Sequence, residues 1–108
     1  MAPAAILVLT NLPDRASAET LAQKLVSARL AACVSIGAPV ESIYHWQGKI
    51  EIAKEVPVTI KTRAGRFADV AATVRAHHPY ELPEIIAVPL IDGYPPYLDW
   101  IEAESSPS

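Results

Sequence analysis

The order of apolar and polar residues divides the chain into strands and helices. Residues 4–10, AAILVLT, form a short continuous apolar run, which predicts a strand buried on both faces. Residues 18–31 repeat apolar side chains at helical spacing, which predicts a helix. The apolar stripe of this helix consists of Leu21, Leu25, Ala28 and Ala32. The chain therefore begins with a strand and a helix that packs against it.

The next segment predicts a long β-hairpin, because the apolar period changes to two at Cys33. The pair Gln47-Gly48 suits a two-residue turn between residues 33–46 and a returning strand that runs to about residue 61. If Trp46 pairs with Lys49, Tyr44 pairs with Glu51 and Ile43 with Ile52. This register places Ile43, Ile50 and Ile52 on one face, expected near the core, and Tyr44 and Trp46 on the other. Val34 and Ile36 have the opposite parity, so a bulge or bend is expected near residues 37–39.

The hairpin is too long to remain inside its own domain. A strand over residues 33–46 reaches roughly 45 Å, whereas a chain of this length folds to a radius of gyration of about 13 Å. The tip is therefore expected to project as an arm. Tyr44 and Trp46 on that arm are predicted to form an association surface between subunits. The alternative is a twisted hairpin that curls back on its own subunit.

The second half of the chain predicts a helix, a strand and a short final helix. The helix covers residues 64–77 and ends before Pro79, and the strand covers residues 84–91, with Pro89 favouring an edge or a bulge. The final helix is YLDWIEAE, with Pro96 in its first turn. The order βαββαβ plus a C-terminal helix predicts a single α+β domain over residues 1–108, ferredoxin-like, with an antiparallel sheet. Residues 104–108 have the composition of a disordered tail.

Composition narrows the class of function. The chain is 51% hydrophobic and 19% charged, which suggests apolar surface covered by a partner subunit. The net charge of −3, without a basic run, argues against nucleic-acid binding. A single cysteine, no apolar run long enough to span a bilayer and no export segment predict a cytoplasmic protein that is not inserted in a membrane.

The stretch AHHPYELPEI, residues 76–85, carries the clearest candidate chemistry. His77 and His78 stand where the chain leaves a helix, so both rings could converge on copper, zinc or nickel. Two imidazoles leave a site incomplete, and Glu81, Glu84, another subunit or water would complete it. The alternative is a surface helix end, where histidines favour the negative end of the helix dipole.

Other candidate residues are weaker. Cys33 has no cysteine or histidine at metal spacing and is read as a small buried hydrophobe. Lys61 lies on the strand face opposite the isoleucines, where it either holds an anion or is simply solvated. No nucleophile elbow, triad or glycine-rich phosphate loop is present, so the chain is expected not to be an enzyme.

Five segments, in order, resemble the CutA family of divalent-cation tolerance proteins. They are LAACVSI, SIYHWQGKIE, TIKTR, AHHPYELPEI and YLDWI, and together they span about residues 21–101. The resemblance implies a ferredoxin-like fold, a tight homotrimer in which long hairpins reach neighbouring subunits, and a link to copper and other divalent cations. The copper site proposed in the family falls on His77 and His78. Some members add a cysteine at the end of the first strand, where this chain has Thr10. Threonine is a poor substitute for a thiolate, so copper binding is expected to be weaker and less selective.

Two functions follow. The leading one is a cytoplasmic homotrimer of divalent-metal tolerance or response that binds copper or a similar cation through His77 and His78. The alternative is a signalling trimer, similar to the nitrogen-regulatory type, that binds a small molecule or anion between subunits. Its cleft would be lined by Lys61, Tyr80, Glu81 and Trp100.

Overall fold

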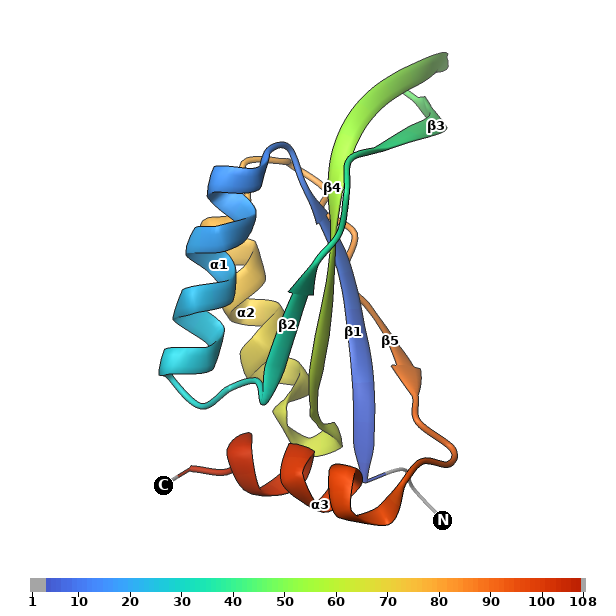
Figure 1. The fold of residues 1–108 in the computed structure, drawn as a ribbon. Helices are drawn as coiled ribbons and strands as arrows, with labels where there is room; N and C mark the ends of the chain where they lie inside the picture. The colour runs from blue at the N-terminus through green and yellow to red at the C-terminus, as the bar shows by residue number, and fades with distance from the viewer. Residues whose placement is uncertain (1–3, 108) are drawn as a thin grey trace.

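Two helices cover one face of an antiparallel sheet in the computed structural model, which describes residues 4–107 (Figure 1). The elements in chain order are β1 (Ala5–Leu12), α1 (Arg15–Ser27), β2 (Cys33–Ile36), β3 (Val40–Trp46), β4 (Lys49–Arg63), the 3-10 turn η1 (Ala64–Arg66), α2 (Phe67–His77), β5 (Ile86–Pro89) and α3 (Pro95–Glu104). The strand order is β2-β4-β1-β5, and β3 pairs with the outer half of β4. This confirms the ferredoxin-like α+β fold, and Pro89 lies at the end of the edge strand β5 as predicted.

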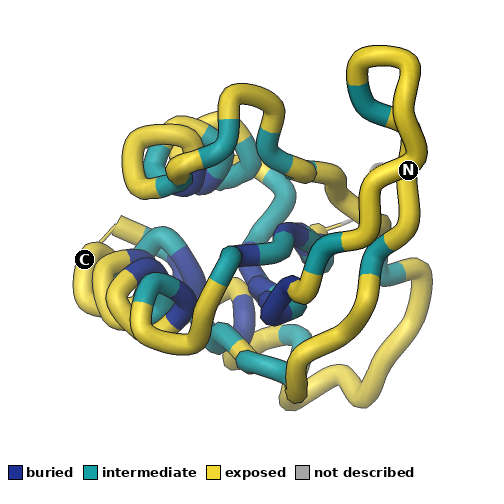
Figure 2. Tube along the Cα trace, turned by 90° about the horizontal axis from the view of Figure 1, so that it is seen from above, coloured by how far each residue is buried: buried dark blue, intermediate teal, exposed yellow. Residues whose placement is uncertain are grey.

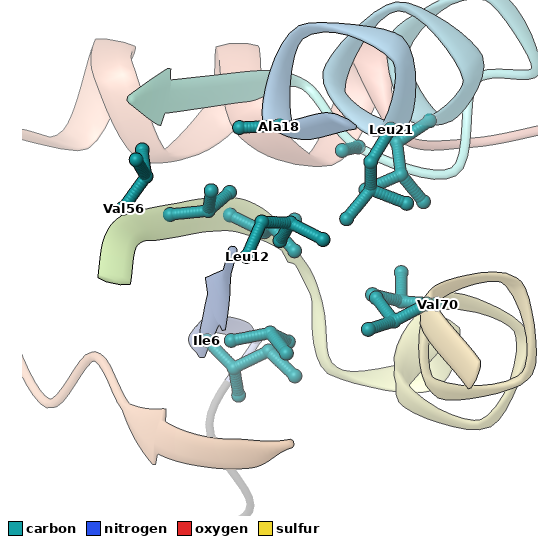
Figure 3. Close-up of a cluster of buried hydrophobic side chains, with 12 residues drawn as sticks. Ile6, Leu12, Ala18, Leu21, Val56 and Val70 are labelled. Atoms are coloured by element: carbon teal, nitrogen blue, oxygen red, sulfur yellow. The ribbon is translucent and has the colours of Figure 1, made fainter. Parts of the chain in front are cut away.

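The core lies between the sheet and the two helices. Even-numbered residues of β1, and those of β4 from Val56 to Thr62, point toward α1 and α2 and are buried, because side chains alternate between the faces of a strand. Figure 3 shows this cluster, in which Leu21 of α1 and Val70 of α2 face Leu12 and Val56 of the sheet. Figure 2 shows the buried trace gathered between the layers. The odd-numbered residues form a second sheet face, which neither α1 nor α2 covers (Figure 1).

The hairpin projects as an arm made of β3 and residues 49–55 of β4 (Figure 1). The molecule is elongated to 44 × 27 × 23 Å. Tyr44 pairs with Glu51 and Ile43 with Ile52, which confirms the predicted register. Gln47 and Gly48 both have positive φ, 50° and 78°, as a tight two-residue hairpin turn requires.

A one-residue bulge separates β2 from β3 at residues 37–39, as expected. Ile36 pairs with Val58 and Val40 with Glu55, so three residues on one strand face two on the other. Gly37 donates its N–H to the carbonyl of Pro57 at 2.9 Å, and a Cβ at position 37 would lie 2.9 Å from the Pro57 ring. Pro57, which lacks an N–H, therefore sits in a central strand at the one place where the ladder is interrupted.

The isoleucine face of the arm is not part of the core. Ile43, Ile50 and Ile52 share a face as predicted, but 64–68% of each remains exposed. The expectation that they lie near the core is wrong because β3 and the outer part of β4 extend beyond the helices (Figure 1). These three side chains form an apolar patch on the arm, which we call the isoleucine face.

Two further elements differ from the sequence prediction. Helix α1 ends at Ser27 rather than residue 31, because Arg29 takes φ 59° and Leu30 returns its N–H to the carbonyl of Leu25. Strand β5 is shorter than residues 84–91, and its residues are exposed rather than buried.

The C-terminal residues also differ from the expected disordered tail. Ser105 is fully buried, donates to the carbonyl of Ile101 and accepts the N–H of Arg63. Arg29 donates to the carbonyl of Ser106 and Arg66 to that of Ser105. These long-range bonds attach the end of α3 to the body, and Ser108 lies outside the described residues.

Candidate functional site

A pocket of about 500 Å³ lies at the base of the arm. One wall is the arm, and the other is the segment between α2 and β5. Aromatic and acidic side chains line most of it: Tyr44, Trp46, Tyr80, Glu55, Glu81 and Glu84. We call this cavity the arm pocket.

The arm pocket joins residues that the sequence assigned to separate roles. Tyr44 and Trp46 were predicted as an association surface, and Tyr80 and Glu81 as part of a cleft. The hairpin register places the two arm aromatics on the odd-numbered face of β4, where residues 80–84 lie against them. In a single subunit, Tyr44 and Trp46 therefore contribute to an intramolecular cavity.

The other two predicted cleft residues lie elsewhere on the same sheet face. The Lys61 Nζ donates to the Tyr97 hydroxyl at 3.2 Å, and the Tyr97 ring stacks on Trp100 with centroids 5.4 Å apart. Lys61 is six residues from Glu55 along β4, a separation of about 20 Å. Within one subunit, the four predicted cleft residues therefore lie in two separate places. Lys61 and Trp100 lie near α3, and Tyr80 and Glu81 lie at the arm.

Glu55 is the residue that the sequence analysis did not single out. Only 8% of it is exposed, although it lies at the junction of body and arm. It takes part in none of the ion pairs formed by the described residues. The available signal was parity, because Glu55 shares the face of β4 that carries Glu51, the partner of Tyr44.

Tyr80 lies between the arm pocket and the histidines. Burial raises the pKa of its phenol, and the neighbouring Glu55 carboxylate raises it further. Its ring also lies 4.6 Å from that of His78, measured between centroids. The phenol therefore keeps its proton and can donate a hydrogen bond toward the Glu55 carboxylate.

Both ring nitrogens of His78 are engaged within the subunit. Nδ1 accepts the backbone N–H of Tyr80 at 3.1 Å, so this nitrogen carries no proton. Nε2 lies at hydrogen-bond distance from the Asn11 carbonyl and must be the protonated nitrogen that donates to it. A metal could bind His78 only after one of these bonds is broken.

His77 differs from its neighbour. It is exposed at the end of α2, and its Nδ1 lies 2.9 Å from the Thr73 carbonyl, to which it must donate. This leaves Nε2 of His77 as the nitrogen with a lone pair directed to solvent. The two rings thus point to different partners, and the pair offers one accessible nitrogen.

The described residues contain no group of three His, Cys, Asp or Glu side chains placed to hold one metal ion. Thr10, at the position of the family's additional cysteine, is 2% exposed, and its hydroxyl has no partner among the described residues. Cys33 pairs across the sheet with Lys61 on the face that the helices leave open. A complete metal site would therefore require ligands from more than one subunit or from solvent.

No helix within residues 4–107 combines the length and the apolar character needed to cross a membrane.

The chain matches a known protein family along nearly its whole length. The family model of the CutA1 divalent ion tolerance protein covers residues 6–104. The divalent-cation tolerance protein CutA of Citrobacter koseri is 37% identical over 101 residues, which are 94% of this chain and 88% of that protein.

Solved structures agree in fold. CutA1 from the psychrotrophic bacterium Shewanella sp. SIB1 is 45% identical, with a TM-score of 0.94 and complete coverage of both chains. A protein of Archaeoglobus fulgidus described as a periplasmic divalent cation tolerance protein CutA is 38% identical, with a TM-score of 0.91 over 94% of this chain and 99% of that one.

Proposed function

Because the chain belongs to the CutA1 divalent ion tolerance family, we propose that it acts in the response to divalent metal cations as a homotrimer. The family is defined by tolerance rather than by a catalysed reaction, in agreement with the expectation that the chain is not an enzyme.

The trimer is supported by apolar surface that one subunit leaves uncovered. The isoleucine face of the arm is about two-thirds exposed, and Ile86 and Val88 on the open sheet face are 51% and 41% exposed. Leu7 and Leu9 pair directly with these two residues of β5, so the apolar surface continues across two strands. Surface of this extent and composition is typical of an interface between subunits.

The cation would bind at His77. Its free Nε2 is the observation that carries this part of the proposal, since imidazole suits copper and related ions. His78 can bind the same cation only if its hydrogen bond with Tyr80 or with Asn11 is broken. Thr10 has no thiolate to add as a ligand. Binding of moderate affinity follows, with a neighbouring subunit or water completing the coordination.

Copper titration by calorimetry tests this role. We expect His77→Ala to abolish the binding heat of copper(II) chloride, and His77→Ala/His78→Ala to add nothing further. His45→Ala is the matched control, because His45 is an exposed histidine on a different element, strand β3 of the arm. Equal binding by the unmodified protein and the double variant would remove the histidines from the proposal.

For localisation we propose the cytoplasm, because the chain's single cysteine fits a reducing compartment. The Archaeoglobus relative is described as periplasmic. Cell fractionation with an antibody against the protein would distinguish the two compartments.

A second candidate function is anion binding between subunits at Lys61. The hydrogen bond to Tyr97 and the Tyr97–Trp100 stack place a lysine and two rings together on the open sheet face. ATP serves as an anionic probe: binding lost in Lys61→Gln but kept in the double histidine variant would favour this function over metal binding.

A further inference from the structure

We propose that the arm pocket binds a small organic cation, namely an ammonium or amidinium group carried on a compact apolar body. This site is distinct from the metal function proposed above and does not depend on it.

The charge of the pocket selects a cation. Three carboxylates line it, from Glu55, Glu81 and Glu84, and no lysine or arginine is among its lining residues. Asn11 donates to Glu84 at 3.0 Å, which satisfies one oxygen but supplies no positive charge. The lining is therefore negatively charged, and none of its three carboxylates forms an ion pair with a described residue.

Among the lining carboxylates, Glu55 most needs a cationic partner, because it is the most buried. It is more than nine-tenths buried, lines the pocket and forms no ion pair with a described residue. Removing a carboxylate from water is costly unless a counter-charge replaces the lost hydration. The nearby Tyr80 phenol can donate a hydrogen bond but is neutral. A ligand's cationic group is the counter-charge that the pocket lacks.

The aromatic side chains define the rest of the ligand. Tyr44 and Trp46 come from the arm and Tyr80 from the facing segment, so rings line both walls. Aromatic faces attract cations and also bury apolar groups. This combination suits a cation attached to a ring or short hydrocarbon.

A metal ion fits the same pocket poorly. The described carboxylates and histidines do not converge on any point where one ion could contact three of them. A volume of about 500 Å³ is instead within the range of small-molecule sites. The distributed charge and the volume both favour an extended organic cation.

The test uses three probes of the same shape and different charge: benzylamine, benzyl alcohol and benzoate. At pH 7 they are a cation, a neutral molecule and an anion. Each is titrated into the intact protein while the indole N–H resonances of Trp46 and Trp100 are followed by NMR. A Trp100→Phe variant assigns the two signals, since the chain has two tryptophans and Trp100 lies near α3.

We expect benzylamine to shift the Trp46 resonance saturably and to bind at least tenfold more tightly than the other two probes. Glu55→Gln should weaken benzylamine at least tenfold while preserving side-chain shape. Glu41→Gln is the matched control, because it removes the same charge from an exposed position of β3 that does not line the pocket.

Several results would overturn the proposal. Equal affinity for all three probes would show an apolar pocket without charge selection. Equal weakening by Glu41→Gln and Glu55→Gln would show an effect of net charge alone. A Trp46 signal unmoved by any probe would mean that a neighbouring copy fills the pocket, and a saturable shift with zinc chloride that Glu55→Gln abolishes would assign the site to metal. If Glu55→Gln fails to fold, the probe series on the unmodified protein still decides the outcome.

Discussion

The backbone N–H of Tyr80 donates a 3.1 Å hydrogen bond to Nδ1 of His78. The opposite nitrogen of the same ring meets the carbonyl of Asn11, 67 residues earlier in the chain. His78 therefore links β1 to the segment that forms one wall of the arm pocket. Of the two adjacent histidines, His78 has a structural role as the clamp between these two segments, and His77 is exposed to solvent.

This division predicts different effects of the two histidines on stability. His78→Ala should lower the free energy of unfolding by about 1–3 kcal/mol, because it leaves an N–H and a carbonyl of the half-buried site without their partner. His77→Ala removes one exposed bond within α2 and should cost less than about 0.5 kcal/mol. Urea unfolding followed by circular dichroism measures both. Equal losses for the two variants would contradict the assignment of the clamp to His78.

Replacing a buried threonine with valine should change the stability in opposite directions at Thr10 and at Thr62. The Thr10 hydroxyl has no partner among the described residues, whereas the Thr62 hydroxyl donates to the Leu30 carbonyl at 2.7 Å. Thr10→Val should stabilise the fold by about 1 kcal/mol, and Thr62→Val should destabilise it by about 1–2 kcal/mol. Thermal unfolding of both variants is the measurement. A loss of stability in Thr10→Val would show that its hydroxyl has a partner after all.

Assembly should depend on the isoleucine face. Ile50→Glu together with Ile52→Glu should reduce the mass in light scattering from three times the 11.6 kDa chain mass toward one. Buried carboxylates without partners oppose an apolar interface. Lys54→Glu changes the net charge by the same amount at an exposed position of the same strand and should leave the mass unchanged. An unmodified protein that is monomeric at micromolar concentration would contradict the trimer itself.

Charged residues at Tyr44 and Trp46 should have a second consequence besides any effect on mass. Because both side chains line the arm pocket, Tyr44→Lys and Trp46→Lys should abolish benzylamine binding there, since each removes a ring and adds a positive charge. Sedimentation and a benzylamine titration by calorimetry, which needs no tryptophan signal, are run on the same samples and separate the two roles. A full loss of assembly with probe binding intact would make these aromatics interface residues alone.

Tyr80 predicts an alkaline loss of stability. Its folded pKa lies above its ordinary value of 10.0, chiefly because of burial, so the folded state holds the phenolic proton more tightly than the unfolded state does. The resulting stabilisation is fully present below pH 10 and is lost as pH rises through the folded pKa. Compared with the unmodified protein, Tyr80→Phe should show a smaller decline in unfolding free energy above pH 10. In Tyr80→Phe, the pH titration of absorbance at the tyrosinate band should lack the step that lies at the highest pH. If the unfolding free energies of the two proteins fell in parallel above pH 10, the raised pKa of Tyr80 would be contradicted.

Local patterns were sufficient to predict the fold. The period-two residues set the register of Tyr44 with Glu51, and the parity conflict between Ile36 and Ile43 located the bulge. The end of α1 was missed because Arg29, not a glycine, takes the left-handed conformation. The attachment of Ser105 was missed because its partners lie about 40 residues or more away in tertiary contact.

The candidate site was less predictable for the same physical reason. Spacing alone suggested that His77 and His78 act together, but their roles are set by bonds to Thr73 and Asn11 that only the folded chain provides. Glu55 reads as a solvated strand residue until the segment after α2 folds across it. The binding of any metal by the histidines remains a prediction.

Because of the bulge at residues 37–39, the direction of the arm can change while the strand pairing of β2 and β3 with β4 stays the same. Deleting one residue between Gly37 and Pro39 would leave every existing partner of β2 and β3 on β4 compatible with one continuous ladder. The deletion would remove only the local bend and added twist that a bulge supplies. Relatives that differ in length at this point could therefore share a fold and an arm sequence while holding the arm at another angle. Insertions there would re-aim the surface that meets a neighbour and resize the arm pocket, without any change in the residues that line it.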